Sequence, residues 1–243
     1  MQILDFTVTE NTQLTRDIWR VRLTEPRIDH SEATCAPQVG QFVNLKIDGL
    51  YLRRPISICD WEIGTYTLIY RVVGQGTEKL AQMQPGQVIN MLTGLGNGFS
   101  IKPAQRPLLI GGGAGVPPMY YLAKELVKSG QKPIALLGFA KQDDVFYADE
   151  FADVCETKVV VGGYVTDELP TDYDAIYACG PEPMLRAIDR AAKELSPGHM
   201  QLSFEARMAC GFGACMACTC RTQMGYKRIC KDGPVLTREE IVW

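Results

Sequence analysis

Histidine is scarce in this sequence of 243 residues, in which only His30 and His199 occur. A zinc site that combines cysteine with histidine therefore has few candidate ligands. Long apolar runs are lacking too: no stretch of about 18 apolar residues occurs, so we expect no membrane-spanning helix. The first residues carry neither a basic stretch nor a cleavage site, so we expect no secretory signal peptide and a cytoplasmic location.

A strong charge imbalance is also lacking, since 25 Lys and Arg residues stand against 28 Asp and Glu residues. Nucleic-acid-binding proteins usually carry a basic surface, so the net charge of −3 predicts no nucleic-acid partner. The apolar content of 46% and the charged content of 22% are typical of a soluble globular protein. The chain is longer than one average domain, so we expect two or three domains.

Cysteine, in contrast, is abundant, and five of the nine cysteines lie between residues 210 and 230. Four of them follow the spacing C-x4-C-x2-C-x11-C, which is the plant-type pattern for a two-iron, two-sulfur (2Fe–2S) cluster. Thiolates are soft ligands that suit iron, and Gly211 and Gly213 allow the loop to bend. The predicted metal ligands are Cys210, Cys215, Cys218 and Cys230.

Zinc and disulfides are the alternative interpretations of these cysteines. Structural zinc usually takes two C-x2-C pairs, or one pair with histidines, whereas this sequence has a single such pair, Cys215 and Cys218. Disulfides need an oxidising compartment. Cys220 falls outside the cluster spacing and is interpreted as a non-ligand. The scattered cysteines are interpreted as buried free thiols: Cys35, Cys59, Cys155 and Cys179.

Residues 1–102 have the pattern of a small antiparallel β-barrel. Apolar and polar residues alternate in several short segments, and turn residues separate these segments. The expected strands are 6–9, 18–23, 42–47, 66–72 and 88–92, and a short helix is expected at 77–83.

Two adjacent arginines, Arg53 and Arg54, lie within this barrel region. Charged side chains on a strand can protect an exposed sheet edge from pairing. Alternatively, arginine forks match phosphate oxygens, so the pair can form an anion site. The residues alone leave both interpretations open.

Residues 103–200 change to alternating strands and helices, which predicts a parallel sheet with ligands at the strand ends. The motif G-x-G-x-x-P, formed by Gly113, Gly115 and Pro118, lies between a strand and a helix and can cradle phosphate. A tight turn of any α/β domain is the alternative. Strands are expected at 108–110, 134–139, 158–161 and 174–178, and helices at 119–128, 145–154 and 184–195.

Several short motifs resemble the ferredoxin–NADP reductase superfamily. The segment Arg54-Pro55-Ile56-Ser57 is similar to its R-x-x-S signature, and 95–99 is similar to the segment that ends its flavin barrel. The resemblance implies that Arg54 binds the FAD pyrophosphate and that Ser57 faces the flavin ring. It also implies flavin contacts from Ile69, Tyr70, Arg71, Gly76 and Thr77.

The turn Cys179-Gly180-Pro181 ends an expected strand. As the same resemblance implies, this turn lies beside the nicotinamide ring of a bound NAD. A small packed residue is the alternative interpretation of Cys179.

A more specific resemblance covers essentially the whole chain. The segments 205–218 and 229–235, together with 53–57, 111–118 and 137–140, resemble the electron-transfer subunit of class 1B dihydroorotate dehydrogenase. The resemblance implies a heterotetramer with an FMN-containing catalytic subunit and electron flow from dihydroorotate to NAD. It also implies an FAD-binding β-barrel (1–102), an NAD-binding-like α/β domain (103–200) and a 2Fe–2S domain (201–243).

Two alternatives remain at this point. The chain can be the flavin and iron–sulfur subunit of another NAD(P)-linked complex, such as a ferredoxin–NADP oxidoreductase, or a non-enzymatic iron–sulfur sensor. It also departs from its relatives, because a glycine-rich segment is nearly absent and Gly162 and Gly163 join the strand 158–161 directly to Tyr164. We therefore expect NAD binding to be retained but weakened.

Overall fold

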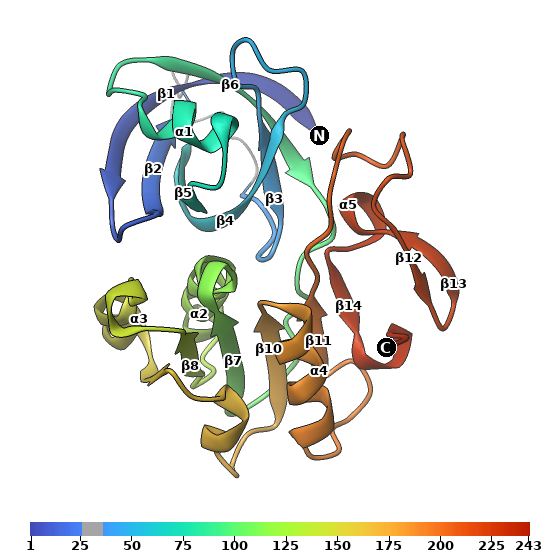
Figure 1. Ribbon diagram of the computed structural model, residues 1–243. Coiled ribbons are helices and arrows are strands. Elements are labelled where there is room, and N and C mark those ends of the chain that lie inside the picture. Colours follow the sequence, from blue (N-terminus) through green and yellow to red (C-terminus); the bar gives the residue numbers. More distant parts are fainter. Residues whose placement is uncertain (26–35) are drawn as a thin grey trace.

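The computed structural model describes residues 1–25 and 36–243, so the predictions for His30 and Cys35 lie outside the described residues. The N-terminal part of the chain forms a β-barrel that lies above an α/β sheet, and the C-terminal segment runs along the side of both (Figure 1). The expected combination of an antiparallel barrel with a parallel-sheet region is confirmed.

The barrel is closed by six antiparallel strands in the order β1-β2-β5-β4-β3-β6. Alternate side chains, such as Phe6, Val21 and Leu68, fill its interior. Strand β1 pairs with both β2 and β6 and thereby closes the sheet. The strands are β1 (Gln2–Gln13), β2 (Ile18–Thr24), β3 (Phe42–Leu45), β4 (Arg54–Glu62), β5 (Thr65–Arg71) and β6 (Val88–Leu95).

Helix α1 (Gln75–Ala81) begins before the expected start at residue 77. The hydroxyl of Thr77 accepts a hydrogen bond from the backbone N–H of Val73 (3.0 Å) and donates one to the carbonyl of Gly74 (3.0 Å). The first helical turn therefore closes around Thr77 instead of starting at it.

The second sheet has six strands in the order β14-β11-β10-β7-β8-β9, in which only β14 is antiparallel to its neighbour. Its central strands are short runs of buried apolar residues because helices cover both faces. The elements are β7 (Pro107–Gly112), α2 (Pro117–Lys128), β8 (Ile134–Phe139), α3 (Ala148–Val154), β9 (Glu156–Val161), β10 (Ala175–Cys179), α4 (Glu182–Ala191), β11 (Met200–Ser203) and β14 (Val235–Thr237).

Two of the expected helices are shorter in the structure. Tyr147 has a φ of 62°, a left-handed conformation that a helix does not contain, so the helix expected over 145–154 begins only at Ala148. Helix α4 ends before 195 because the N–H of Lys193 leaves the helix and donates to the hydroxyl of Tyr173 (3.1 Å).

Helix α2 joins the barrel to the sheet. The ammonium group of Lys124 lies 2.6 Å from the carboxylate of Asp60 on β4, and both side chains are largely buried. One continuous apolar core runs from the barrel interior to this helix. The two regions therefore hold a fixed position relative to each other, which fixes the cavities between them.

The C-terminal segment is packed into the α/β sheet. It forms the hairpin β12 (Thr219–Thr222) and β13 (Gly225–Arg228) and the short helix α5 (Ile229–Asp232), and β14 then joins the edge of the α/β sheet. A second apolar core connects the buried cysteines of this segment to the sheet. These strands were not expected from the sequence.

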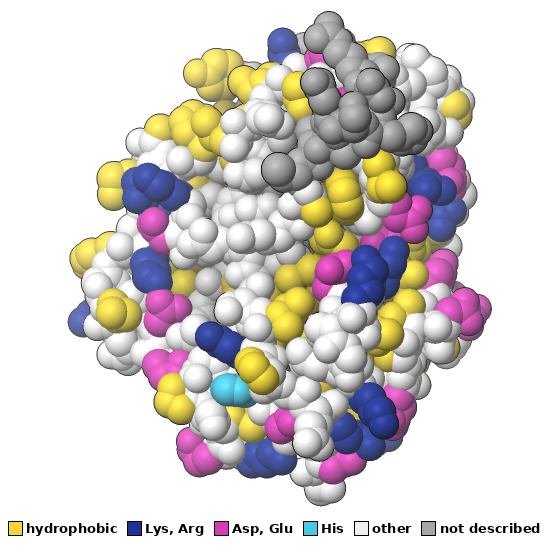
Figure 2. All heavy atoms as spheres, turned by 180° about the vertical axis from the view of Figure 1, so that it is seen from behind, with side chains coloured by type: hydrophobic (Ala, Val, Ile, Leu, Met, Phe, Trp, Pro, Cys, Tyr) yellow, Lys and Arg dark blue, Asp and Glu magenta, His cyan; other side chains and the backbone are white. Residues whose placement is uncertain are grey.

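The surface carries charges of both signs. Lysine and arginine side chains are interspersed with aspartate and glutamate side chains over the face seen in Figure 2. Within residues 1–25 and 36–243, no helix has the length and apolar character needed to cross a membrane.

Candidate redox centre

A cavity of about 490 Å³ lies where the barrel, the α/β sheet and the start of the cysteine segment meet. The barrel contributes β4 and the end of β5, the sheet contributes the ends of β10 and β11, and residues 204–208 close one side. Several predicted flavin-binding residues come together here. The lining residues include Arg54, Pro55, Ile56, Ser57, Arg71, Thr77, Ala114, Cys179, Glu205, Met208 and Pro234.

Arg54 and Arg53 have different environments. The Arg54 guanidinium packs against Gly76, where an added Cβ would lie 2.2 Å from the Arg54 Nε. Arg53 instead donates hydrogen bonds to the carbonyl of Asn44 (3.2 Å) and to the side chain of Asn90 (2.6 Å). Arg54 also donates to the carbonyl of Leu52, but of the two arginines only Arg54 lines the cavity.

Ile69 and Tyr70 do not line this cavity. Both are buried on β5, and the hydroxyl of Tyr70 donates to the side-chain oxygen of Asn11 (3.1 Å). Burial raises the pKa of Tyr70 well above its ordinary value. These two side chains support the barrel, and Arg71, the next residue, reaches the cavity.

Cys179 lies in the cavity wall at the end of β10. Burial is the main cause that raises the pKa of its thiol to about 12, and the Glu205 carboxylate adds to this. The side chain is therefore a neutral thiol at physiological pH. A Cβ at Gly115 would lie 2.1 Å from the carbonyl oxygen of Cys179, so Gly115 lets the glycine turn approach the Cys-Gly-Pro turn closely.

Glu205 and Met208 were not expected as cavity residues. Both follow β11, whose position beside β10 brings them to the same cavity as Cys179. The only signal for them in the sequence was their place inside the segment that resembles the iron–sulfur family.

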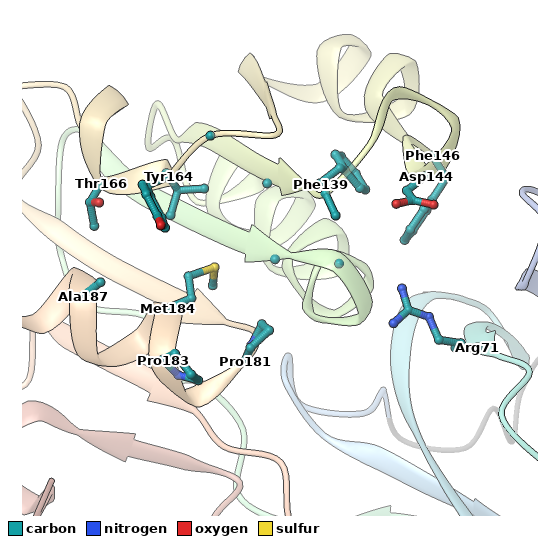
Figure 3. Close-up of a pocket in the computed structure, with 16 residues that line it drawn as sticks. Arg71, Phe139, Asp144, Phe146, Tyr164, Thr166, Pro181, Pro183, Met184 and Ala187 are labelled. Atoms are coloured by element: carbon teal, nitrogen blue, oxygen red, sulfur yellow. The ribbon is translucent and has the colours of Figure 1, made fainter.

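A second cavity of about 470 Å³ lies at the ends of the parallel strands. Figure 3 shows Arg71 reaching from the barrel toward the side that holds Asp144 and Phe146, with Tyr164 and Met184 farther along the cavity. Arg71 lines both cavities, and its guanidinium lies 3.1 Å from the carboxylate of Asp17. The two cavities are therefore neighbours.

Gly113 lines this second cavity at the glycine turn. The shortened segment after strand β9 lies on the other side of this cavity. Gly162 takes a left-handed φ of 69° and turns the chain so that Gly163 and Tyr164 line the cavity directly. The cavity thus persists without the glycine-rich segment, but the side chain of Tyr164 is 77% exposed.

The cysteine loop arranges its thiols in pairs. The sulfur of Cys210 accepts hydrogen bonds from the backbone N–H groups of Ala214 (3.3 Å) and Cys215 (3.5 Å). Burial opposes ionisation, but these donors and the N–H of Phe212 outweigh it and lower the pKa of Cys210 to about 6. The loop is therefore built to stabilise a thiolate.

Cys218 and Cys230 form the second pair, and both are buried. The N–H of Cys230 donates to the sulfur of Cys218 (3.4 Å). Burial first, and then the neighbouring Cys218 and Cys210, raise the pKa of Cys230 to about 12. Binding of a metal would require this thiol to lose its proton.

Two pairs of thiols match the chemistry of a 2Fe–2S cluster, in which each iron takes two protein ligands. Among the described residues, no group of three or more His, Cys, Asp or Glu side chains is arranged to hold one metal ion. Cys220 lies on β12, opposite Lys227 of β13, and belongs to neither thiol pair. The donor set of four thiols in two pairs fits a 2Fe–2S cluster.

Comparison with known proteins agrees with this arrangement. The family model for the iron–sulfur cluster binding domain of dihydroorotate dehydrogenase B matches residues 205–242. The dihydroorotate dehydrogenase B (NAD(+)) electron transfer subunit of Bacillus caldolyticus is 46% identical over 227 residues, which cover 84% of this chain and 87% of that protein. The subunit of the same name from Bacillus cereus (strain G9842) is 39% identical and covers 100% of this chain and 99% of its own length.

Solved structures show the same architecture. An NADH-dependent reduced ferredoxin–NADP oxidoreductase superposes with a TM-score of 0.85 and 26% identity, over 98% of this chain and 90% of that chain. Phthalate dioxygenase reductase, at 18% identity, shares the fold with a TM-score of 0.70 over 84% of this chain and 70% of its own. The resemblance seen in the sequence is confirmed, and the chain belongs to the family of dihydroorotate dehydrogenase B electron transfer subunits.

Proposed function

We propose that this chain passes electrons between a partner flavin subunit that oxidises dihydroorotate to orotate, its own 2Fe–2S cluster, its own FAD, and NAD. The observation that carries the proposal is the shared wall of the first cavity. Cys179 and Ala114 of the nucleotide region line one part of it, and Met208 and Pro234, which flank the cysteine segment, line another. A flavin exchanges electron pairs with nicotinamide and single electrons with iron.

The FAD site is assigned to the barrel side of this cavity. Arg54 supplies charge-assisted hydrogen bonds to the pyrophosphate, and its position against Gly76 supports this role. Ser57 and Thr77 supply hydroxyl groups, and Pro55 and Ile56 supply apolar contact beside the ring. Ile69 and Tyr70 act through the barrel by placing Arg71.

The second cavity is assigned to NAD. Gly113 allows the backbone to approach a phosphate, and the guanidinium of Arg71 supplies positive charge where the two cavities meet. Gly115 keeps this turn close to Cys179, so that the nicotinamide end faces the flavin cavity. The open side at Tyr164 supports the expectation of weakened binding.

The cluster is assigned to the pairs Cys210 with Cys215 and Cys218 with Cys230. The N–H groups that point at the sulfur of Cys210 hold negative charge on the thiolates. The four described cysteines outside this set form no disulfide, which supports a reducing compartment, the cytoplasm. We also propose the domain boundaries at residues 102 and 200. Strands β11 and β14 of the C-terminal domain nevertheless join the six-stranded sheet of the middle domain.

The proposed partner is the FMN-containing catalytic subunit of dihydroorotate dehydrogenase, in a heterotetramer. Among the described residues, the barrel, the α/β sheet and the cysteine segment leave no further fold to bind an organic substrate. The named relatives are electron transfer subunits of that enzyme, which supports a catalytic subunit on another chain.

Co-expression with that catalytic subunit tests the proposal. The complex should reduce NAD with dihydroorotate, and omission of this chain should abolish NAD reduction while dihydroorotate still reduces an artificial acceptor. The alternative, suggested by the ferredoxin–NADP oxidoreductase likeness, predicts instead that the chain exchanges electrons with ferredoxin and that dihydroorotate gives no NADH.

A further inference from the structure

Asn44 lies on β3 of the barrel, but its side chain contacts the cysteine loop. The side chain is 1% exposed, and its Nδ2 donates a hydrogen bond to the carbonyl of Cys210 (3.3 Å). A carbonyl oxygen can only accept, so the amide nitrogen is the atom that faces it. The bond links the flavin barrel directly to the first predicted cluster ligand.

The loop is shaped to receive this amide. Gly211 follows Cys210 with a left-handed φ of 79°, and an added Cβ there would lie 2.3 Å from the Nδ2 of Asn44. A side chain at 211 would therefore strain the backbone and displace the amide. The glycine serves the approach of Asn44 as well as the bend of the loop.

Keeping an asparagine at this place carries a cost. Its Oδ1 is buried and has no hydrogen-bond partner among the described residues, which is unfavourable for stability. The other residues of β3, Phe42, Val43 and Leu45, are apolar and buried. An apolar residue would fill the space without this cost, so the N–H donor is the useful part of Asn44.

The barrel also holds the backbone of Asn44 in place. Arg53 donates one hydrogen bond to its carbonyl (3.2 Å) and another to the side chain of Asn90 (2.6 Å), which in turn donates to Asp5 (2.7 Å). This chain of polar contacts ends at the cysteine loop. It gives a role to Arg53, the arginine that does not line the flavin cavity.

We propose that Asn44 is a positioning residue that fixes the Cys210 end of the loop and raises the reduction potential of the cluster. The inference rests on the proposed cluster ligands. Reduction adds negative charge, and donors near the ligands favour the reduced form. The hydrogen bond from Asn44 withdraws negative charge from the peptide bond between Cys210 and Gly211. Asn44 therefore acts on the cluster through Cys210.

Two substitutions of Asn44 test this role in the purified chain with its cofactors. Asn44→Asp keeps the shape and, in its ionised form, replaces the donor with a buried acceptor. Asn44→Leu removes the donor without adding charge. Asn97→Ala is the matched control, because the exposed Asn97 also donates to a carbonyl of the cysteine segment, that of Asp232 (3.3 Å).

The readouts are the midpoint potential of the cluster, followed by electron paramagnetic resonance during a redox titration, and the FAD content. Asn44→Asp should disfavour the reduced cluster by roughly tenfold or more, about 59 mV for a one-electron couple. Asn44→Leu should shift the potential in the same direction by less, and Asn97→Ala should leave it unchanged. All variants should retain FAD.

An unchanged potential in both Asn44 variants, with the cluster intact, would overturn the inference. Loss of the cluster from both variants with FAD retained, while Asn97→Ala keeps its cluster, would support it. An equal shift in Asn97→Ala would also overturn it, because the effect would then be general to the interface. If the wild-type chain holds no cluster, the proposed function itself fails, and this result is distinct from the others.

Discussion

Replacement of Gly76 with alanine tests the assignment of Arg54 to the FAD pyrophosphate. A Cβ at position 76 would lie 2.2 Å from the Nε and 2.8 Å from the Cζ of Arg54, which is far too close. These atoms are the end of a flexible side chain, so the guanidinium moves and the barrel stays folded. The change therefore displaces Arg54 without removing it.

The expected loss follows from the hydrogen bonds that the guanidinium makes. A hydrogen bond to a charged group contributes about 1.5–3 kcal/mol. At about 1.4 kcal/mol for each factor of ten, loss of one such bond weakens FAD binding roughly 10- to 140-fold. Arg54→Ala should weaken it at least as much, and Arg53→Ala should weaken it less.

Gly74→Ala is the matched control for Gly76→Ala. It lies two residues earlier, has an extended φ of 170°, and an added Cβ there meets nothing within 4 Å. The assay is the dissociation constant of FAD with the flavin-free chain, measured from the quenching of flavin fluorescence. Wild-type affinity in Gly76→Ala, or equal weakening in Gly74→Ala, would refute the reasoning.

Three further predictions concern the cluster, the α2 contact and the nucleotide. Cys218→Ser should lose the cluster and Cys220→Ser should retain it, measured as iron and acid-labile sulfide per chain; the reverse result would contradict the ligand assignment. Lys124→Ala should lower the free energy of unfolding by about 1–3 kcal/mol, because it leaves a buried carboxylate without its cation. Burial lowers the pKa of Lys124, but the hydrogen bond to Asp60 outweighs it and raises the pKa above its ordinary value of 10.5. The stabilisation is therefore complete below that value and declines as the pH rises through the raised pKa. Urea unfolding of wild type and variant should differ at about pH 8 and converge at strongly alkaline pH; a difference that persists there would contradict the ion pair. Steady-state assays should give a high KM for NAD but normal turnover with an artificial acceptor, because the cavity is open at Tyr164. A low KM for NAD would contradict the weakening.

The sequence was most informative where local pattern decides structure. Alternation predicted five of the six barrel strands, all except β4, short apolar runs predicted the sheet strands β7, β8, β9 and β10, and cysteine spacing predicted the cluster loop. Arg53 and Arg54 show what local pattern could not predict. Both are arginines in the same segment, and only the fold shows that Arg53 is held by Asn90 and that Arg54 faces the cavity.

Contacts between distant segments account for what the sequence did not predict. Strand β14 forms only because β11 offers an edge, and neither segment is long enough to read as a strand alone. The sequence pattern placed Tyr147 inside a helix, but its left-handed φ means that α3 begins only after it. Asn44 and Gly211 are separated by most of the chain, so their fit depends entirely on how the barrel and the loop pack together.

Anaerobic titration of the isolated chain with NADH is the most direct test of the central claim, that one chain connects a nicotinamide through FAD to a 2Fe–2S cluster. Absorption reports the flavin, and electron paramagnetic resonance reports the cluster. The account predicts that NADH reduces both, and that a chain stripped of FAD shows no cluster reduction by NADH although dithionite still reduces it. Reduction of the cluster by NADH in the flavin-free chain, or a wild-type chain that binds no flavin, would contradict the account.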